Sequence, residues 1–317
     1  MARPTPPTTG AAHGPTASPR AASLPQGVLT ALALMCTMLW AGAQIGVKYG
    51  LEAAPPLALM SLRFLAAPAL MLPVIALVKS PWPRTRAAWA RTLGLGVLNN
   101  TLYLGITALG LSSVSAGLSC VLIGLNPLLL AIGGALFFGE RVTGRTLLGL
   151  LGGLLGVTFV MAGRLGADNA LSGALLILLA NVTMVAGNLL YKRWQKDCGL
   201  LVSHAMQLLV GGITLLAVSL ASEPWQTIVW GRRLLAAETF LVFGVSFGAM
   251  LTWLFLLSRG SASKAGAFLF LVPLFGLAES ALVLGESLSA RDLLGAAFTT
   301  LCIWYAQVAS AEARSAR

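Results

Sequence analysis

The chain has 317 residues, of which 57% are apolar and 10% are charged. A soluble domain carries roughly 25% charged residues, so this composition and the mean hydropathy of +0.85 exclude a water-soluble domain, a coiled coil and a disordered protein. They favour an integral membrane protein. The net charge of +11 does not indicate nucleic-acid binding, because the basic residues lie between apolar runs and form no stripe interleaved with aromatic side chains.

Residues 1–26 are rich in Pro, Thr, Ala and Ser and predict a disordered cytoplasmic tail, with a transit peptide as the alternative. The apolar runs that follow predict ten transmembrane helices, since one span needs about 20 residues. The predicted ranges are 28–47, 55–78, 92–110, 113–137, 146–163, 171–191, 201–220, 239–257, 262–284 and 293–309. A β-barrel is excluded, because the runs are continuous and do not alternate between apolar and polar residues.

The orientation follows from the basic residues between the spans. With ten spans, the side that holds both termini receives fifteen Lys and Arg residues and the opposite side receives five, while Arg63 lies inside a span. Because cytoplasmic loops carry the excess of Lys and Arg, we expect both termini, including a tail at 311–317, to be cytoplasmic.

The sequence contains an internal repeat. Residues 139–149 (GERVTGRTLLG) match residues 285–295 (GESLSARDLLG) at six of eleven positions, with an offset of 146 residues. Pro127 and Pro273 match at the same offset. Each repeat, 27–163 and 171–310, would hold five helices. An odd number of spans inverts the second repeat in the membrane, an arrangement typical of secondary transporters that work by alternating access.

These motifs resemble the EamA-like family of the drug/metabolite transporter superfamily. Each half carries a proline in its fourth helix and a Gly-Glu pair before its fifth. The first half has LNP at 125–127 and GE at 139–140, and the second half has LVP at 271–273 and GE at 285–286. The WAG at 40–42 is similar to the start of the family's first helix.

The resemblance covers residues 27–310. It implies ten helices, cytoplasmic termini, a central cavity and, in bacterial members, export of amino acids, nucleobases or other small metabolites across the inner membrane. Arg63 stands where the family often has Arg. Glu279 departs from the pattern, since the family usually has a small or apolar residue there, and this departure would mark a subgroup with its own coupling or substrate.

Arg63 and Glu279 are the only charged residues predicted deep inside spans. A charge there costs about 2.5–3.5 kcal/mol on insertion scales, so it generally faces a cavity or a partner. At about 1.5 Å per residue, both lie roughly 10–12 Å from the outer end of their helices. We hypothesise that they pair in one state and that protonation of Glu279 breaks the pair. The alternatives are a static packing pair, or an Arg63 side chain that reaches the interface.

Other polar and aromatic residues of the spans suit a cavity for a small zwitterion or heterocycle. The predicted substrate-binding residues are Trp40, Gln44, Asn100, Tyr103, Asn181, Asn188, Trp253 and Phe270. An interhelical hydrogen bond is the alternative role for each amide, and Trp253 and Phe270 could equally face lipid. Pro127 and Pro273 predict mid-helix kinks that act as matched hinges, with helix packing as the alternative. Glu140 and Glu286 are predicted to cap or salt-bridge the turns before helices 5 and 10.

The sequence therefore predicts a secondary-active exporter of small metabolites, with protons as a candidate coupling ion. An uptake carrier, an exchanger, and a scaffold or lipid-flipping protein are the alternatives. An enzyme is not predicted, because the Asp residues are isolated in loops, His13 and His204 cannot form a His-Glu-x-x-His motif, and no Walker A motif occurs. We expect no metal or cofactor. The expected partners are a small-molecule substrate and the lipid bilayer, with the chain as a monomer or homodimer.

Overall fold

The computed structural model describes residues 25–139, 144–162, 170–194, 198–258 and 268–315. The regular secondary structure of the described residues is entirely helical, which confirms the predicted all-α class. Seven described helices are long and apolar enough to cross a membrane, and two shorter apolar helices, Leu147–Ala162 and Phe268–Leu284, accompany them. Most of the predicted N-terminal tail, Glu140 and the start of the predicted ninth helix lie outside the described residues.

The first half of the chain contains α1 (Gln26–Gly50), α2 (Pro56–Leu77), α3 (Arg86–Gly96), the π-helical stretch η1 (Val97–Leu104), α4 (Gly105–Leu111), α5 (Ala116–Ile123), α6 (Asn126–Phe138) and α7 (Gly144–Ala162). The second half contains α8 (Ala170–Trp194), α9 (Leu200–Ser222), the 3₁₀ turn η2 (Trp225–Thr227), α10 (Arg232–Thr239), the π-helical stretch η3 (Phe240–Ala249), α11 (Met250–Ser258), the 3₁₀ turn η4 (Phe268–Leu271), α13 (Val272–Leu284) and α14 (Ala290–Ser315). In both halves the π-helical stretch continues its neighbours without a break, as the long helices Arg86–Leu111 and Arg232–Leu256.

Several helices extend beyond the apolar runs that predicted them. The third and eighth predicted spans begin at Arg86 and Arg232, six and seven residues earlier than expected, and the last helix continues to Ser315. Their added turns contain charged residues that can remain in water at a membrane surface. The apolar run is therefore shorter than the helix that contains it, and hydropathy alone underestimates the length of these helices.

The repeat is visible in the backbone of α6 and α13. Both have 13 residues with proline second, and both end at a glycine in the left-handed conformation, Gly139 with φ of 64° and Gly285 with φ of 67°. A proline in the first turn removes no intrahelical hydrogen bond, because the N–H there has no partner within the helix. The two predicted helices are thus interrupted just before these prolines, and Pro127 and Pro273 each begin a new helical segment, α6 and α13.

The two π-helical stretches also follow the repeat. Moved by the 146-residue offset, Val97–Leu104 would fall on residues 243–250, which overlap Phe240–Ala249. π-Helical turns are uncommon and frequently mark functional sites. Both halves therefore carry the same irregularity at equivalent places.

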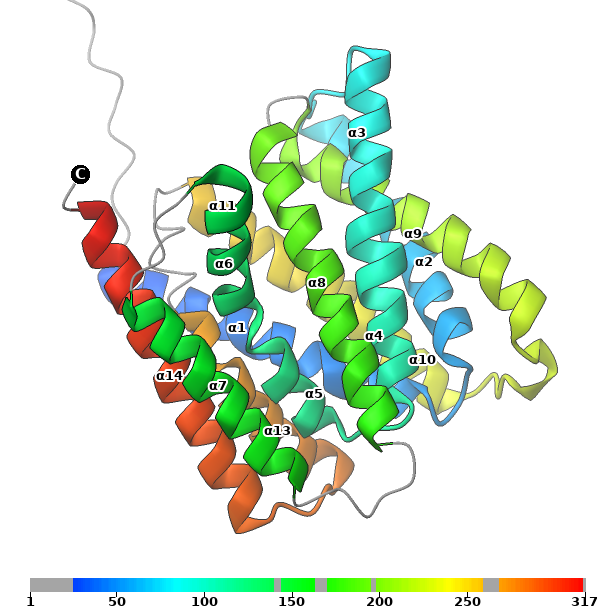
Figure 1. Cartoon of the computed structure of the whole chain (residues 1–317). Helices are drawn as coiled ribbons and strands as arrows, with labels where there is room; N and C mark the ends of the chain where they lie inside the picture. Colours follow the sequence, from blue (N-terminus) through cyan, green and yellow to red (C-terminus); the bar gives the residue numbers. More distant parts are fainter. Residues whose placement is uncertain (1–24, 140–143, 163–169, 195–197, 259–267, 316–317) are drawn as a thin grey trace, which may run out of the picture.

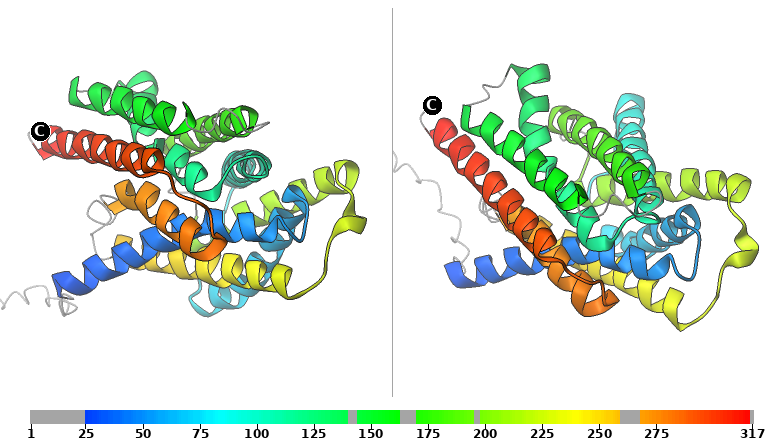
Figure 2. Two further views of the ribbon diagram at one scale, coloured as in Figure 1. Left: turned by 90° about the horizontal axis from the view of Figure 1, so that it is seen from below. Right: turned by 60° about the horizontal axis from the view of Figure 1, so that its bottom comes forward.

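Small residues bring helices from the two halves together. Figures 1 and 2 show α7 running beside α14. A methyl group added at Gly152 of α7 would lie 2.5 Å from the Cys302 sulfur of α14, and one at Gly149 would lie 2.6 Å from the Ala306 Cβ. Such close contact provides the van der Waals packing that holds helices together in lipid.

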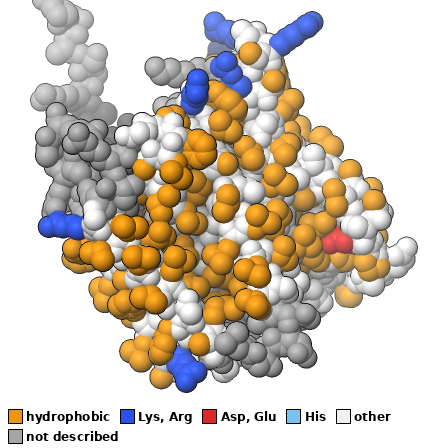
Figure 3. All heavy atoms as spheres, viewed as in Figure 1, with side chains coloured by type: hydrophobic (Ala, Val, Ile, Leu, Met, Phe, Trp, Pro, Cys, Tyr) orange, Lys and Arg blue, Asp and Glu red, His pale blue; other side chains and the backbone are white. Residues whose placement is uncertain are grey.

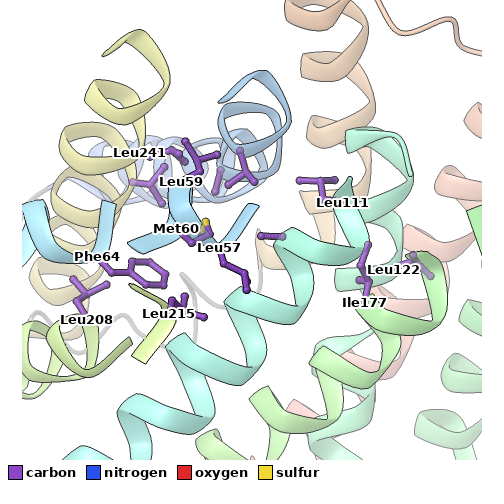
Figure 4. Close-up of a cluster of buried hydrophobic side chains, with 14 of the residues drawn as sticks. Leu57, Leu59, Met60, Phe64, Leu111, Leu122, Ile177, Leu208, Leu215 and Leu241 are labelled. Carbon is purple, nitrogen blue, oxygen red and sulfur yellow. The ribbon is translucent and has the colours of Figure 1, made fainter. Parts of the chain in front are cut away.

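An apolar core fills the space between α2 and α9. In Figure 4 the ring of Phe64 lies between Leu208 and Leu215, with Met60 one turn away along α2. The outer surface is also apolar, with side chains such as Leu155 of α7 and Leu282 of α13 65% and 85% exposed. In Figure 3 apolar side chains cover most of the visible face, and Lys and Arg lie towards its edges, most of them at the top, as expected for a protein surrounded by lipid.

Candidate functional site

Helix α1 lies at the centre of the candidate site, because it packs against α5, η3, α11 and α13. Gly42 lets two side chains approach it closely. A methyl group at Gly42 would lie 3.0 Å from Oε2 of Glu279 and 3.0 Å from Cζ of Phe240. The half-buried Glu279 of α13 is therefore directed at α1, and the glycine leaves room for its carboxyl group.

Two predicted binding residues meet beside this region. The rings of Trp40 in α1 and Trp253 in α11 are 5.3 Å apart and tilted by 54°. One turn along α1 from Trp40, Gln44 accepts a hydrogen bond of 3.2 Å from the hydroxyl of Ser119 in α5. The aromatic pair thus joins α1 to α11, and the amide joins α1 to α5.

A second polar group connects η1 with α9. Asn99 Nδ2 donates to Gln207 Oε1 at 2.9 Å, and Gln207 Nε2 donates to Ser203 Oγ at 2.9 Å. The Asn99 side chain also contacts Gly187 of α8. Its neighbour Asn100, a predicted binding residue, is 5% exposed and packs against Gly211 of α9.

Buried amides also lie where α8 meets α5 and α6. Asn126 Nδ2 donates to the Met184 sulfur at 2.9 Å, and Asn181 Nδ2 donates to the Leu122 carbonyl at 2.9 Å. The buried Tyr103 side chain lies beside Asn126. The Oδ1 atoms of Asn99, Asn126 and Asn181 are enclosed and accept no hydrogen bond from the part of the chain that the structure describes. Buried acceptors usually have a donor, so these three oxygens are suited to receive one from a ligand or water.

The other two predicted binding residues lie apart from these contacts. Asn188 of α8 is half-buried and has no hydrogen-bond partner among the described residues. Phe270, in η4, packs against the main apolar core. The structure thus brings Trp40 and Trp253 together but gathers the eight residues into no single contact cluster within the described chain.

A third polar group surrounds Arg63 in the interior of α2. Arg63 is 5% exposed, and its Nε donates to Ser246 Oγ of η3 at 3.3 Å. Glu238 of α10 and His204 of α9 interact electrostatically with it, and His204 also bonds to the backbone of Ser246. Four helical segments therefore direct polar groups towards one point.

This arrangement includes an acidic residue that lies outside the predicted spans. Glu238 belongs to the helix Arg232–Leu256, which is long and apolar enough to cross a membrane and begins seven residues before the predicted span. Among the described residues no ion pair joins Arg63 to Glu279, and Glu238 is the acidic group that acts on Arg63. Sequence reasoning missed Glu238 because the polar run around it lowers the hydropathy of the first two turns. No helix-start signal marked the earlier beginning, because the first turn holds Arg232 and Arg233 where acidic residues are favoured.

Two carboxylates cap helices that are distant in the sequence. Glu286 accepts hydrogen bonds from the backbone N–H groups of Ala116 at 2.8 Å and Gly117 at 3.2 Å, at the start of α5. Glu223 does the same for Leu57 and Ala58, at the start of α2. The prediction that Glu286 serves the turn before the last helix is therefore wrong, since it caps α5 in the other half of the chain. No local pattern could have indicated this partner.

Comparisons with known proteins agree with this fold. The sequence profile of the EamA-like transporter family matches residues 27–162 and 171–306. An uncharacterized transporter of Synechocystis is 30% identical over 84% of this chain and 86% of its own, and one of Bacillus subtilis is 28% identical over 87% and 90%. A protein of Salmonella typhimurium named a probable amino-acid metabolite efflux pump is 27% identical over 84% and 90%. A solved crystal structure shares the fold with a TM-score of 0.65 at 17% identity, over 91% of this chain and 99% of its own.

Proposed function

Because the chain belongs to the EamA-like transporter family, and is thus a multi-pass membrane protein, we propose that it is a secondary-active exporter of small metabolites that works by alternating access. Two inverted five-helix repeats, 27–163 and 171–310, would make up its ten spans. Two matched irregularities of the backbone carry this proposal. Helices α6 and α13 have the same length, the same second-position proline and the same left-handed glycine at the end, and the π-helical stretch η1, shifted by 146 residues, overlaps η3. Equivalent breaks in two halves let one half adopt the conformation of the other.

The substrate would bind between α1 and the helices around it. The ring pair of Trp40 and Trp253 offers an aromatic wall, and the unpartnered oxygens of Asn126 and Asn181 offer acceptors. We assign the same region to the remaining predicted binding residues, Gln44, Asn100, Tyr103, Asn188 and Phe270. The helix starts at Pro127 and Pro273 would serve as the hinges.

Glu279 would couple transport to protons. Its carboxyl group lies against Gly42 of α1 and is half-buried, so a change in its charge alters the contact between α13 and α1. The Arg63–Glu279 pair would belong to another state of the transport cycle. The name of the Salmonella relative, a probable amino-acid metabolite efflux pump, favours export and amino-acid-like substrates. An uptake carrier or exchanger of the same fold, or a lipid-flipping or scaffold protein, is the alternative.

The location follows from the same family and from the excess of basic residues on one side. The protein would lie in a bacterial inner membrane with both termini in the cytoplasm. One chain contains both repeats, so a monomer could complete the transport cycle, and a homodimer is the alternative.

A growth panel tests this function. The wild type and Glu279→Gln are overproduced in a sensitive bacterium at matched membrane levels and exposed to inhibitory amino acids, nucleobase analogues and cationic drugs. Resistance from the wild type alone would name the substrate class and support the coupling role of Glu279. Equal resistance from both would retain the exporter and remove that role. No resistance in any class, with no counterflow in proteoliposomes, would overturn the proposed function.

A further inference from the structure

The buried guanidinium of Arg63 is left incompletely paired. Only its Nε donates a hydrogen bond, to Ser246, and the two terminal nitrogens bond no described residue. Arg stays charged at any accessible pH, so this group cannot avoid the cost of burial by losing its proton. A buried charge needs a partner of opposite sign, and the described residues provide none within ion-pair distance.

The atoms around Arg63 differ in their access to open space. Both carboxyl oxygens of Glu238 and Nε2 of His204 are fully enclosed and have no hydrogen-bond partner among the described residues. The terminal nitrogens of Arg63 also lack a hydrogen-bond partner in the described chain, with the Phe64 ring 5.4 Å from the guanidinium carbon, but they are not among the enclosed atoms, in keeping with the 5% of the residue that stays accessible. The accessible part of this polar group therefore lies at the guanidinium and not at the Glu238 carboxyl group.

We propose that Arg63 binds the carboxylate of the transported compound, and that Glu238 competes with this carboxylate for Arg63 in another state of the transport cycle. The inference rests on the proposed function and names its substrate class, small molecules with a free carboxylate. A guanidinium offers two parallel N–H donors that match the two oxygens of a carboxylate. With Nε held by Ser246, the two terminal nitrogens remain for the ligand.

Glu238 is suited to the role of competitor. It lies near enough to Arg63 for their charges to interact, but its oxygens are enclosed without a donor. A neutral carboxylic acid tolerates such a position far better than an ionised one. When a substrate carboxylate binds Arg63, Glu238 takes up one proton from solvent and remains in this enclosed position. When the substrate leaves, Glu238 returns the proton to solvent and pairs with Arg63 in another state of the cycle, since no ion pair joins the two side chains in the state that the structure describes.

The other titratable group that acts on Arg63 is His204 from α9, whose ring also bonds to the backbone of Ser246. Lys48 of α1 donates instead to the carbonyls of Leu111 and Val114 and interacts with Glu286. Arg233 of α10 is paired with Glu52. Glu238 is therefore the acidic group of the described chain that competes for Arg63.

The first experiment measures binding to the purified full chain in detergent by ligand-dependent thermal stabilisation. The probes are L-leucine, L-phenylalanine, L-threonine and L-glutamate, each compared with its α-carboxamide. We expect at least one acid to bind and its amide to bind at least tenfold more weakly, as expected for the loss of one charge-assisted contact. This comparison uses the wild type, so it does not depend on how a variant folds. Equal binding of acid and amide would overturn the proposal.

Variants then assign the contact to Arg63. Arg63→Gln should weaken binding of the acid at least tenfold and leave that of the amide unchanged, while Arg63→Lys should recover part of the affinity. The matched control is Arg233→Gln, which removes an exposed arginine paired with Glu52 and should bind like the wild type. Unchanged discrimination between acid and amide in a folded Arg63→Gln protein would overturn the assignment.

The competition is tested by pH between 5 and 8. The test uses a Glu279→Gln background, which removes the proposed coupling carboxyl group. There, affinity for the acid should fall as pH rises, because an ionised Glu238 competes for Arg63, and adding Glu238→Gln should make the affinity flat and no weaker. A pH dependence retained in the double variant would overturn the competitor role. If the protein transports nucleobase analogues or cationic drugs but binds no carboxylate, the exporter stands and this inference falls. If no class of compound is bound or transported, the proposed function itself falls.

Discussion

Glu286 and Ala116 join the two halves of the chain, because the carboxylate of Glu286 accepts the backbone N–H of Ala116 at 2.8 Å across 170 residues of sequence. The N-terminus of a helix carries unpaired N–H groups and a partial positive charge. A carboxylate from elsewhere in the fold stabilises both. The contact therefore acts as a helix cap and as a tie between α5 and the turn after α13.

Removing this cap should lower stability. Glu286→Ala should destabilise the protein by about 1–2 kcal/mol, as expected for the loss of a helix cap, and Glu286→Gln should cost less because one oxygen acceptor remains. The measurement is chemical or thermal unfolding of the purified protein in detergent. Glu52→Ala is the control, since it breaks only an exposed ion pair and should cost at most about 1 kcal/mol. Equal losses from Glu286→Ala and Glu52→Ala would contradict the cap.

The contact between α7 and α14 should not accept a larger residue. In Gly152→Leu the new side chain would collide with Cys302, and overpacking of this kind costs about 1–3 kcal/mol. Gly94→Leu is the matched control, because a side chain at Gly94 of α3 meets nothing within 4 Å. The unfolding assay should show a loss for Gly152→Leu alone. Similar stability of both variants would mean that the two helices can separate without cost.

Gly42 should be required for transport more than for folding. Gly42→Val would push away Glu279 and the Phe240 ring, both 3.0 Å from an added methyl group, so we expect at least a tenfold loss of transport at matched membrane levels. Gly27→Val, on the same helix, adds its side chain to open space and should transport like the wild type. Wild-type transport by Gly42→Val would show that the Glu279 carboxyl group needs no fixed place beside α1.

The proposed orientation predicts where each end of the chain lies. A fluorescent protein fused to the C-terminus should fluoresce, and alkaline phosphatase fused there should be inactive, because both termini are expected in the cytoplasm. A phosphatase fusion within the loop near Arg232 and Arg233 should be active instead. An active C-terminal phosphatase fusion would rule out the proposed topology.

The sequence indicated which charged residues lie within helices better than it indicated which side chains they contact. Polarity inside an apolar run is a local signal, and it selected Arg63 and Glu279 correctly as charges within helices. Equal depth in the membrane suggested that these two pair, but depth does not say which way a helix is turned. In the structure Arg63 faces Glu238 and Ser246, while Glu279 faces Gly42.

The sequence by itself determined the all-helical membrane class, the family and the internal repeat, because each depends on composition and spacing along the chain. Lipid requires continuous apolar helices, and a duplicated segment keeps its prolines and glycines in one register. The tertiary structure alone decided that Glu286 caps α5, that Trp40 meets Trp253 and that Glu238 lies by Arg63. These contacts depend on the rotation and close approach of helices distant in the chain, and packing of the complete fold sets both.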